Sequence, residues 1–370
     1  MILFMLEKLI SINNFSILNA FTYLSSRAIL ALITSILISM YLYPRFIRRL
    51  RSIKAGQPIR SLGLEEEMQK QGTPTMGGIV IIFATLVSAI LWMDLANRHF
   101  ITLFIISVGF GSVGFFDDYL KITKKGTKGL PGKKKMAGLI FFATLAVGWH
   151  LWSSFHLTSM HISNYNPFAI NIPFFKNLAL DLSYFFIPFA VFVMVGSSNA
   201  VNLTDGLDGL AIGPVITCAM ALTILSYITG NVVLAKYLYY HVVPDAGEIS
   251  IFLSALIGAS IGFLWYNTFP AQIFMGDSGA LALGGIIGTV AIITGHEILL
   301  VFMGGVFVIE TLSVIIQVWS FKTRGKRVFR MAPLHHHYQK KGWPEQKITV
   351  RLWIISFMLG LLSILTLKLR

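Results

Sequence analysis

The chain is dominated by apolar runs that are long enough to cross a lipid bilayer. Ten such runs lie at about 20–43, 75–96, 100–117, 136–153, 182–200, 211–230, 249–267, 280–294, 298–320 and 349–367. A membrane-spanning helix needs about 20 mostly apolar residues, because the hydrocarbon core is about 30 Å thick. With 55% hydrophobic and 12% charged residues and a mean hydropathy of +0.73, the 370-residue chain is too apolar for a soluble domain. We therefore predict an all-α polytopic membrane protein of about ten transmembrane helices, forming a single integral-membrane domain over residues 1–370.

Basic residues are concentrated in three connecting segments. The segments 44–74, 118–135 and 321–351 hold seven, seven and nine of the 30 Lys and Arg residues. The positive-inside rule places all three in the cytoplasm, and the even numbers of predicted spans between them agree with this. Both termini are then periplasmic, and the polar segments 199–210 and 269–279 open to the cytoplasmic face. The membrane therefore accounts for the net charge of +14, and we expect no nucleic-acid partner.

The segment NAVNLTDGLDGL, residues 199–210, combines two amides, two carboxylates and two glycines between apolar runs. Asn199, Asn202, Asp205 and Asp208 recur every three residues, so a straight helix would spread them over half its circumference. If the helix tightens or unwinds at the glycines, all four can face one cavity. Such groups suit a sugar nucleotide or a hydrated cation. A polar turn between two membrane helices is the alternative.

Three further carboxylates lie at predicted helix ends. Asp117 and Asp118 are adjacent at the end of the third span, where carboxylates are costly unless solvated, paired or bound to metal. A solvated helix end is the alternative interpretation. Asp277 lies between glycines at the mouth of the eighth span, in NTFPAQIFMGDSG, where a carboxylate is well placed for Mg²⁺. Phe274 can stack on a base, although core packing explains it equally well.

Basic and imidazole side chains flank these carboxylates. His335, His336 and His337 are consecutive, so they cannot all bind one metal from a regular helix, but they suit hydrogen bonding to phosphate oxygens. A solvated loop is the alternative. Lys70 precedes a Gly-Thr-Pro-Thr turn at which a helix start can bind an anion, with Thr73 or Thr75 as its cap. Glu310 and Gln317 lie inside the ninth span and indicate either a broken, bundle-facing helix or hydrogen bonds between helices.

Together these segments predict a cytoplasmic acidic cleft ringed by Lys and His at the membrane surface. Carboxylates with Mg²⁺ at the centre and cations at the rim are typical of the transfer of a diphosphate-linked group. The interfacial position indicates one lipid substrate and one substrate from the cytosol. A secondary transporter is the rival from another class, and it predicts charges near the bilayer midplane and internal repeats. Here the carboxylates gather at one face, and the sequence has no evident repeat.

Five motifs together resemble those of a known enzyme superfamily. They are KQGTPTMGG at 70–78, DDYLK at 117–121, NAVNLTDGLDGLA at 199–211, FMGDSGALALGG at 274–285 and APLHHHYQKKGWPE at 332–345. The chain resembles the polyprenyl-phosphate N-acetylhexosamine-1-phosphate transferases end to end and, within them, the bacterial phospho-N-acetylmuramoyl-pentapeptide transferases (the MraY family). The triple-His segment discriminates these from relatives that use UDP-GlcNAc, which stay as the alternative. Ser278 and Ala280 depart from the GD[TV]GSLALGG pattern that we expect, which affects only the fine shape of that turn.

The resemblance implies the first membrane step of peptidoglycan synthesis, with both termini outside, at the bacterial inner membrane. Undecaprenyl phosphate would attack the sugar-side phosphate of UDP-MurNAc-pentapeptide and give lipid I and UMP, with Mg²⁺ as cofactor and a homodimer as the expected assembly. Either direct attack or a covalent phospho-aspartate is compatible with this. By position, Asp277 would bind Mg²⁺, and Asp117 would deprotonate or orient the lipid phosphate with support from Asp118. The resemblance also implies a catalytic role for His336 and substrate binding by Thr75. Asn199, Asn202, Asp205 and Asp208 would line the nucleotide side of the site, and Lys70 and Phe274 would bind uracil. The residues that would bind phosphates or the sugar-peptide are Lys121, Lys133, His335, His336 and His337.

Overall fold

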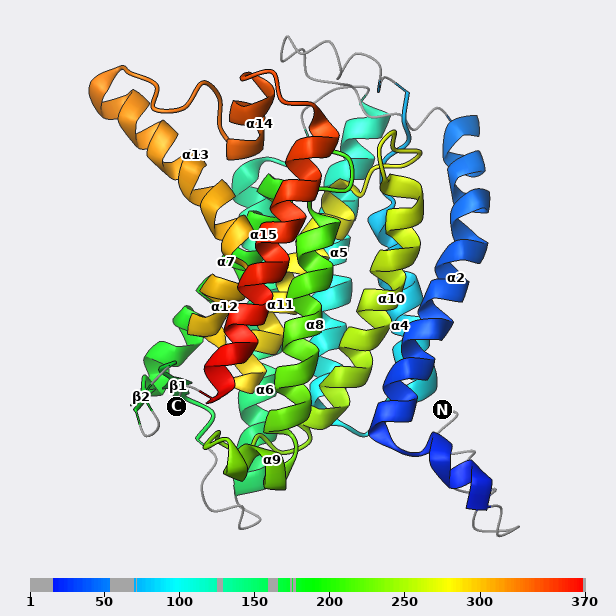
Figure 1. Ribbon diagram of the computed structural model, residues 1–370, viewed down its shortest axis with the longest axis vertical. Coiled ribbons are helices and arrows are strands. Elements are labelled where there is room, and N and C mark those ends of the chain that lie inside the picture. Colours follow the sequence, from blue (N-terminus) through cyan, green and yellow to red (C-terminus); the bar gives the residue numbers. More distant parts are fainter. Residues whose placement is uncertain are drawn as a thin grey trace.

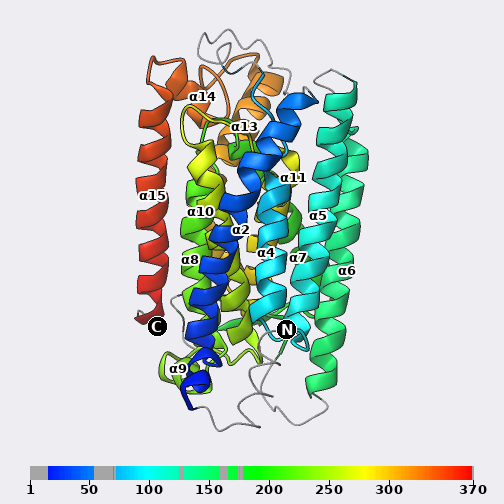
Figure 2. The same ribbon diagram turned by 90° about the vertical axis from the view of Figure 1, so that its right-hand side faces the viewer.

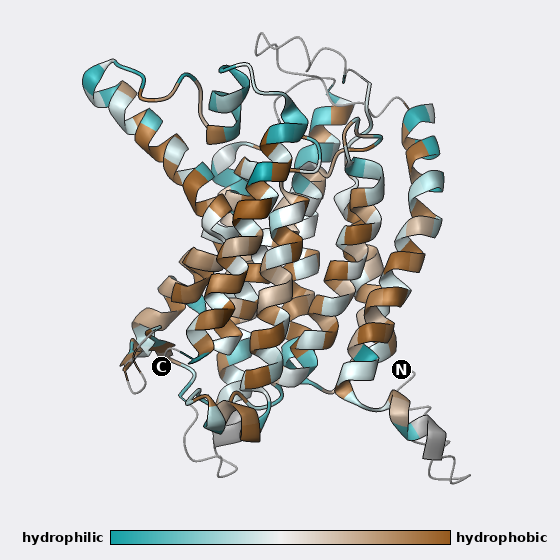
Figure 3. Ribbon diagram, viewed as in Figure 1, coloured by the Kyte–Doolittle hydropathy of each residue, from teal (hydrophilic) through white to brown (hydrophobic). Residues whose placement is uncertain are grey.

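The computed structural model is a bundle of long helices that run side by side (Figures 1 and 2). It describes residues 16–53, 70, 72–124, 129–158, 166–173, 175 and 178–368. Within these residues, nine helical stretches are long and apolar enough to span a membrane, and α4 (Gly78–Trp92) is a shorter apolar helix of 15 residues. Apolar residues cover the middle of the bundle and hydrophilic residues gather at the end that carries α14 (Figure 3). The prediction of an all-α polytopic membrane protein is confirmed.

Each predicted span corresponds to helical structure. The first eight are α2 (Leu24–Ser52), α4, α5 (Arg98–Thr123), α6 (Gly132–Thr158), α7 (Phe186–Thr204), α8 (Ile212–Thr229), α10 (Ile249–Asn267) and α11 (Gly276–Thr294). The ninth is divided into α12 (Glu297–Met303) and α13 (Gly305–Arg324), and the tenth is α15 (Glu345–Leu365). Short helices α9 (Val232–Tyr237) and α14 (Leu334–Gln339) lie in connections, and η1 (Ser16–Phe21) precedes α2. The antiparallel strands β1 (Ala169–Asn171) and β2 (Ala179–Asp181) form a short two-stranded sheet between α6 and α7.

Several helices continue past the apolar runs that predicted them. α2 extends to Ser52 and includes Arg45, Arg48, Arg49 and Arg51, because charged residues are compatible with a helix once it has left the hydrocarbon. α5 likewise continues to Thr123. Asp117 and Asp118 are therefore inside a helix and not at its end, which corrects the expected position.

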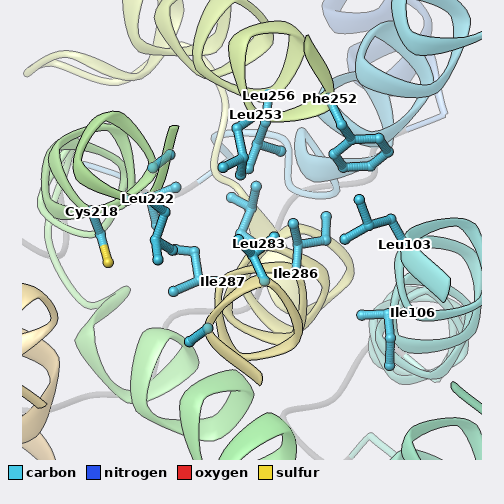
Figure 4. Close-up of a cluster of buried hydrophobic side chains, with 14 of the residues drawn as sticks. Leu103, Ile106, Cys218, Leu222, Phe252, Leu253, Leu256, Leu283, Ile286 and Ile287 are labelled. Atoms are coloured by element: carbon cyan, nitrogen blue, oxygen red, sulfur yellow. The ribbon is translucent and has the colours of Figure 1, made fainter. Parts of the chain in front are cut away.

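α11 is the central helix of the bundle. It packs against α4, α5, α7 and α8, and almost every residue from Ser278 to Thr294 is buried. Side chains from α5, α8, α10 and α11 meet in the core next to Leu283 and Ile287 (Figure 4). α11 is apolar on all sides, so neighbouring helices surround it. This packing holds the whole helix, including its first turn, in one position. The first turn of α11 carries Asp277, so the bundle core positions this carboxylate.

α13 leans away from the other helices at the end that carries α14 (Figure 1). The chain returns from it through α14 to α15, which lies along the outside of the bundle (Figures 1 and 2). Gln317 fixes the return, since its Oε1 accepts the backbone N–H groups of Val328 (3.1 Å) and Phe329 (2.9 Å). Both interpretations of Glu310 and Gln317 therefore have support: the span is interrupted, and both side chains form hydrogen bonds between segments.

Candidate active site

Three carboxylates meet where α5 and α11 come together. Asp117 and Asp118 lie in the last two turns of α5, and Asp277 lies in the first turn of α11. One carboxylate oxygen from each lies within 4.8 Å of the others. Asp117 and Asp118 are only 3% and 1% exposed, so the alternative of a solvated helix end is wrong. A cluster of two buried carboxylates and one partly buried carboxylate is unfavourable unless cations neutralise it, and the surrounding residues show how this happens.

Asp118 fixes the start of α11. Its Oδ1 accepts the backbone N–H of Asp277 (3.1 Å) and its Oδ2 accepts that of Ser278 (3.0 Å). The first N–H groups of a helix have no partner inside it, so this carboxylate satisfies two of them and interacts favourably with the helix dipole. Gly114, one turn before Asp118, permits the close approach, because a Cβ there would lie 2.3 Å from the Asp277 carbonyl oxygen. Asp118 therefore holds Asp277 in place.

Two ammonium groups converge on one oxygen of Asp277. Lys121 Nζ lies 2.9 Å and Lys135 Nζ lies 2.7 Å from Asp277 Oδ2, and Lys121 also lies 2.5 Å from Asp117 Oδ2. Asn202 Nδ2 donates to Asp277 Oδ1 (2.8 Å), and the Leu130 N–H donates to Asp117 Oδ1 (2.7 Å). Three carboxylates against two ammonium groups leave one negative charge, so the cluster attracts a further cation.

The structure places Lys135 against the acidic cluster, whereas Lys133, which we expected to hold phosphates or the sugar-peptide, does not contact it. Lys133 is exposed, whereas the Lys135 side chain is 17% exposed. The sequence carries a signal that distinguishes them. Lys135 is one turn before Leu139, which begins the buried stripe that continues through Ala143 to Ala146 on α6. Residues four apart lie on the same helix face, so helical periodicity favours Lys135.

The four polar residues at the end of the fifth predicted span, which is α7, do not form one set. α7 ends at Thr204, and the turn that follows uses Gly209 at φ +71°, a conformation that favours glycine. The unwinding that the sequence suggested is therefore present. Asn202 contacts Asp277, but Asn199 Nδ2 donates to the Val195 carbonyl of its own helix (2.8 Å). Burial, with Asp277 and Asp118 nearby, raises the pKa of Asp205 to about 8.

Asp208 belongs to a second cluster with Lys70 and Glu345. Lys70 Nζ lies 2.7 Å from Asp208 Oδ1 and 2.6 Å from Glu345 Oε1. The Asp208 N–H also donates to Glu345 Oε1 (2.5 Å), and the Ala271 N–H donates to Asp208 Oδ2 (3.0 Å). The aromatic ring over which the Lys70 ammonium lies, at 5.9 Å, belongs to Phe269. Our sequence interpretation did not single out Glu345, because its partners are distant in the chain.

The turn before α4 differs in detail from the prediction. The N-cap residue of α4 is Gly77 and no side chain caps it, so the expected capping by Thr73 or Thr75 is wrong. Thr75 is buried beside Gly276, and no described residue forms a hydrogen bond with its hydroxyl. Phe274 is half-buried, and its backbone pairs with Pro74 and Gly77 (2.8 Å each). The segment before α4 is thereby fastened to the segment before α11.

The three histidines lie on α14 with different partners. His335 is buried, and its Nδ1 lies 3.1 Å from Glu310 Oε2 on α13, while its Nε2 faces Gly206 in the turn after α7. His336 Nδ1 lies 2.7 Å from Gln339 Oε1, and burial lowers the pKa of His336 to about 4. His337 Nδ1 accepts the Arg330 N–H (3.1 Å). His336 is therefore neutral at pH 7, and the segment is docked on the site and is not merely a solvated loop.

Comparison with known proteins agrees with this geometry. Residues 100–295 match the family described as glycosyl transferase family 4, and residues 70–82 match a phospho-N-acetylmuramoyl-pentapeptide-transferase signature. A phospho-N-acetylmuramoyl-pentapeptide-transferase of Thermodesulfovibrio yellowstonii is 50% identical over 356 residues, which cover 95% of this chain and 96% of that protein. The two matched ranges contain Lys70, the turn after α7 and all three carboxylates of the acidic cluster.

Proposed function

The chain belongs to the phospho-N-acetylmuramoyl-pentapeptide transferases of glycosyl transferase family 4, and we propose that the cluster of Asp117, Asp118 and Asp277 is where it transfers its substrate. The protein is a multi-pass protein of the bacterial inner membrane that transfers phospho-MurNAc-pentapeptide to a lipid carrier. The observation that carries the site assignment is the convergence of three carboxylates within 4.8 Å at one end of a membrane bundle, with two lysines beside them.

The reaction exchanges one phosphorus–oxygen bond for another. An oxygen of undecaprenyl phosphate attacks the sugar-side phosphorus of UDP-MurNAc-pentapeptide, and the bond from that phosphorus to the bridging oxygen breaks. UMP leaves with the bonding electrons, and lipid I is formed. Negative charge accumulates on the bridging and non-bridging oxygens, so positioned cations are the main source of catalysis. Lys121 and Lys135 are the cations in this cluster.

The acidic cluster fits a magnesium ion. Carboxylate oxygens are the ligands that Mg²⁺ prefers, and it takes one or two of them beside water and substrate phosphates. Asp277 is the ligand that we propose, since its Oδ2 already attracts two ammonium groups. When bound, Mg²⁺ would supply positive charge to the diphosphate oxygens. Asp118 positions Asp277 through the start of α11, and Asp117 orients the lipid phosphate or accepts its proton.

The nucleotide would lie on the side of the turn after α7. Asp205, Asp208 and Lys70 supply acceptors and a donor there, and Phe269 and Phe274 supply aromatic rings near the same segments. His336 and His337 on α14 would contact the sugar-peptide, with neutral His336 offering a hydrogen bond and not a charge, while buried His335 would hold α14 against Glu310. We further propose that this end of the bundle faces the cytoplasm, that both termini are periplasmic, and that the protein is a homodimer.

UMP release by the purified protein in detergent tests this function. We expect release that requires undecaprenyl phosphate, UDP-MurNAc-pentapeptide and Mg²⁺ together. Release with UDP-GlcNAc in place of the peptide-bearing donor would keep the reaction but contradict the assigned substrate. No release from folded protein would contradict the function and would favour a transporter, which substrate flux without UMP formation would then detect.

A further inference from the structure

Glu345 is an acidic side chain that the reaction itself does not require, yet it is almost completely buried beside the proposed nucleotide side. It is the first residue of α15, and its side chain is 2% exposed. A buried carboxylate is costly to desolvate, so its position depends on the partners that compensate for this cost. Those partners are Lys70, which precedes α4, and Asp208, which lies in the turn after α7.

The Glu345 carboxylate accepts hydrogen bonds from two donors at once. Lys70 Nζ donates to Oε1 (2.6 Å) and to Oε2 (2.7 Å), and the Asp208 N–H donates to Oε1 (2.5 Å). Lys70 Nζ also donates to Asp208 Oδ1 (2.7 Å). Glu345 therefore shares the Lys70 ammonium with Asp208, and it holds the Asp208 backbone at the same time.

The same turn is fastened to α15 by apolar and indole contacts. Trp353 Nε1 donates to the Gly209 carbonyl (3.0 Å), and Leu207 and Leu210 pack against Ile348. These contacts hold the turn against the helix but leave the Asp208 carboxylate free to rotate. Lys70 Nζ on Oδ1 (2.7 Å) and the Ala271 N–H on Oδ2 (3.0 Å) fix the direction of that carboxylate, and Glu345 fixes the position of the Lys70 ammonium.

We propose that Glu345 is a positioning residue for the nucleotide-bearing substrate, acting through Lys70 and Asp208. This rests on the proposed function, because it requires the turn after α7 to contact the nucleotide. A glutamine at this position has no charge, and its NH₂ group would replace the oxygen Oε2 that accepts from Lys70, so a donor would face the Lys70 ammonium. Lys70 would then pair with Asp208 alone, and the turn would lose a charge-assisted hydrogen bond.

Binding of UMP to the purified protein, measured by calorimetry, tests the proposal. We expect Glu345→Gln to bind UMP about tenfold more weakly than wild type, as expected for the loss of a hydrogen bond to a charged group. The KM for the UDP-linked donor should rise similarly, while kcat and the KM for undecaprenyl phosphate stay near wild type. Gln346→Ala is the matched control, because Gln346 is the exposed neighbour in the same helical turn and should bind UMP like wild type.

Wild-type UMP affinity in folded Glu345→Gln would overturn the proposal. A kcat that is about tenfold lower, with unchanged UMP affinity and unchanged KM, would also overturn it. If Glu345→Gln does not fold, Glu345→Asp takes its place, since it keeps the charge but shortens the side chain. Weaker UMP binding by Glu345→Asp at unchanged kcat would support the proposal, and wild-type binding would overturn it. No UMP binding by the wild-type protein would overturn the proposed function, and this proposal with it.

Discussion

Replacing Lys135 by methionine removes one of the two ammonium groups that contact Asp277. The Lys135 Nζ to Asp277 Oδ2 distance is 2.7 Å, and the side chains are only 17% and 16% exposed. Loss of Lys135 changes the cluster of three carboxylates and two ammonium groups from one excess negative charge to two. The remaining cluster would then repel both phosphate-bearing substrates.

The expected loss of kcat/KM in Lys135→Met follows from the contact between Lys135 and Asp277. At an effective dielectric constant of 20, two unit charges 2.7 Å apart attract each other by about 6 kcal/mol, most of which offsets desolvation. The net contribution of a hydrogen bond to a charged group is about 1.5–3 kcal/mol. If this is lost in the transition state, kcat/KM falls about 10- to 150-fold.

Lys133→Met is the matched control, because it removes the same charge two residues away from an exposed position. We expect it to change kcat/KM by less than about twofold. Both variants should be assayed by UMP release at saturating Mg²⁺, after thermal unfolding has shown that they fold. Equal losses in the two variants, or a loss confined to Lys133→Met, would refute the assignment of Lys135 and the charge argument behind it.

Three further predictions follow from other parts of the site. His336→Ala should abolish turnover in folded protein, because the neutral imidazole on α14 is then lost; activity that survives at saturating substrate would mean that His336 does not contact the substrate. Gly114→Ala should lower the melting temperature by an amount equivalent to about 1–3 kcal/mol, because the new Cβ would lie 2.3 Å from the Asp277 carbonyl oxygen. Gly148→Ala is the control, since a Cβ at Gly148 meets open space and should not lower the melting temperature. Equal melting temperatures for the two variants would contradict this packing. Burial raises the pKa of Asp205 from its ordinary 3.8 to about 8, so the folded protein keeps this proton to a higher pH than the unfolded chain and its stability falls as pH rises from about 4 to 8. Asp205→Asn should therefore raise the melting temperature more at pH 8 than at pH 5 in metal-free buffer, and an equal change at both would contradict the shift.

The helical spans could be predicted because they follow from hydropathy. All ten apolar runs are helical in the structure, nine of them in helices long enough to span a membrane and one in the shorter α4, since a bilayer accepts few other structures. The boundaries were less predictable, because a helix can continue into the aqueous region, as α2 does through Arg51. The break between α12 and α13 falls at Gly304, before the polar residues Glu310 and Gln317 that indicated an interrupted helix.

The site was predictable in its residue types and less so in its pairings. The structure brings Asp117, Asp118 and Asp277 together, as the motifs indicated. It places Lys135 against Asp277 and leaves Lys133 exposed, a distinction that depends on helical phase and not on charge. Glu345 could not be singled out from local sequence, because its partner Lys70 is 275 residues away and only the folded bundle brings them together.

Binding of Mn²⁺, as a spectroscopic substitute for Mg²⁺, tests the central claim most directly. Electron paramagnetic resonance titration of the purified protein, without substrates, would compare wild type with Asp277→Asn. We expect one ion per chain in the wild type, at least about tenfold weaker binding in the variant, and no Mg²⁺-dependent turnover by that variant although it folds. Equal Mn²⁺ affinity in the two proteins, or near-normal turnover by Asp277→Asn, would contradict the assignment of Asp277 as the metal ligand at the centre of the site.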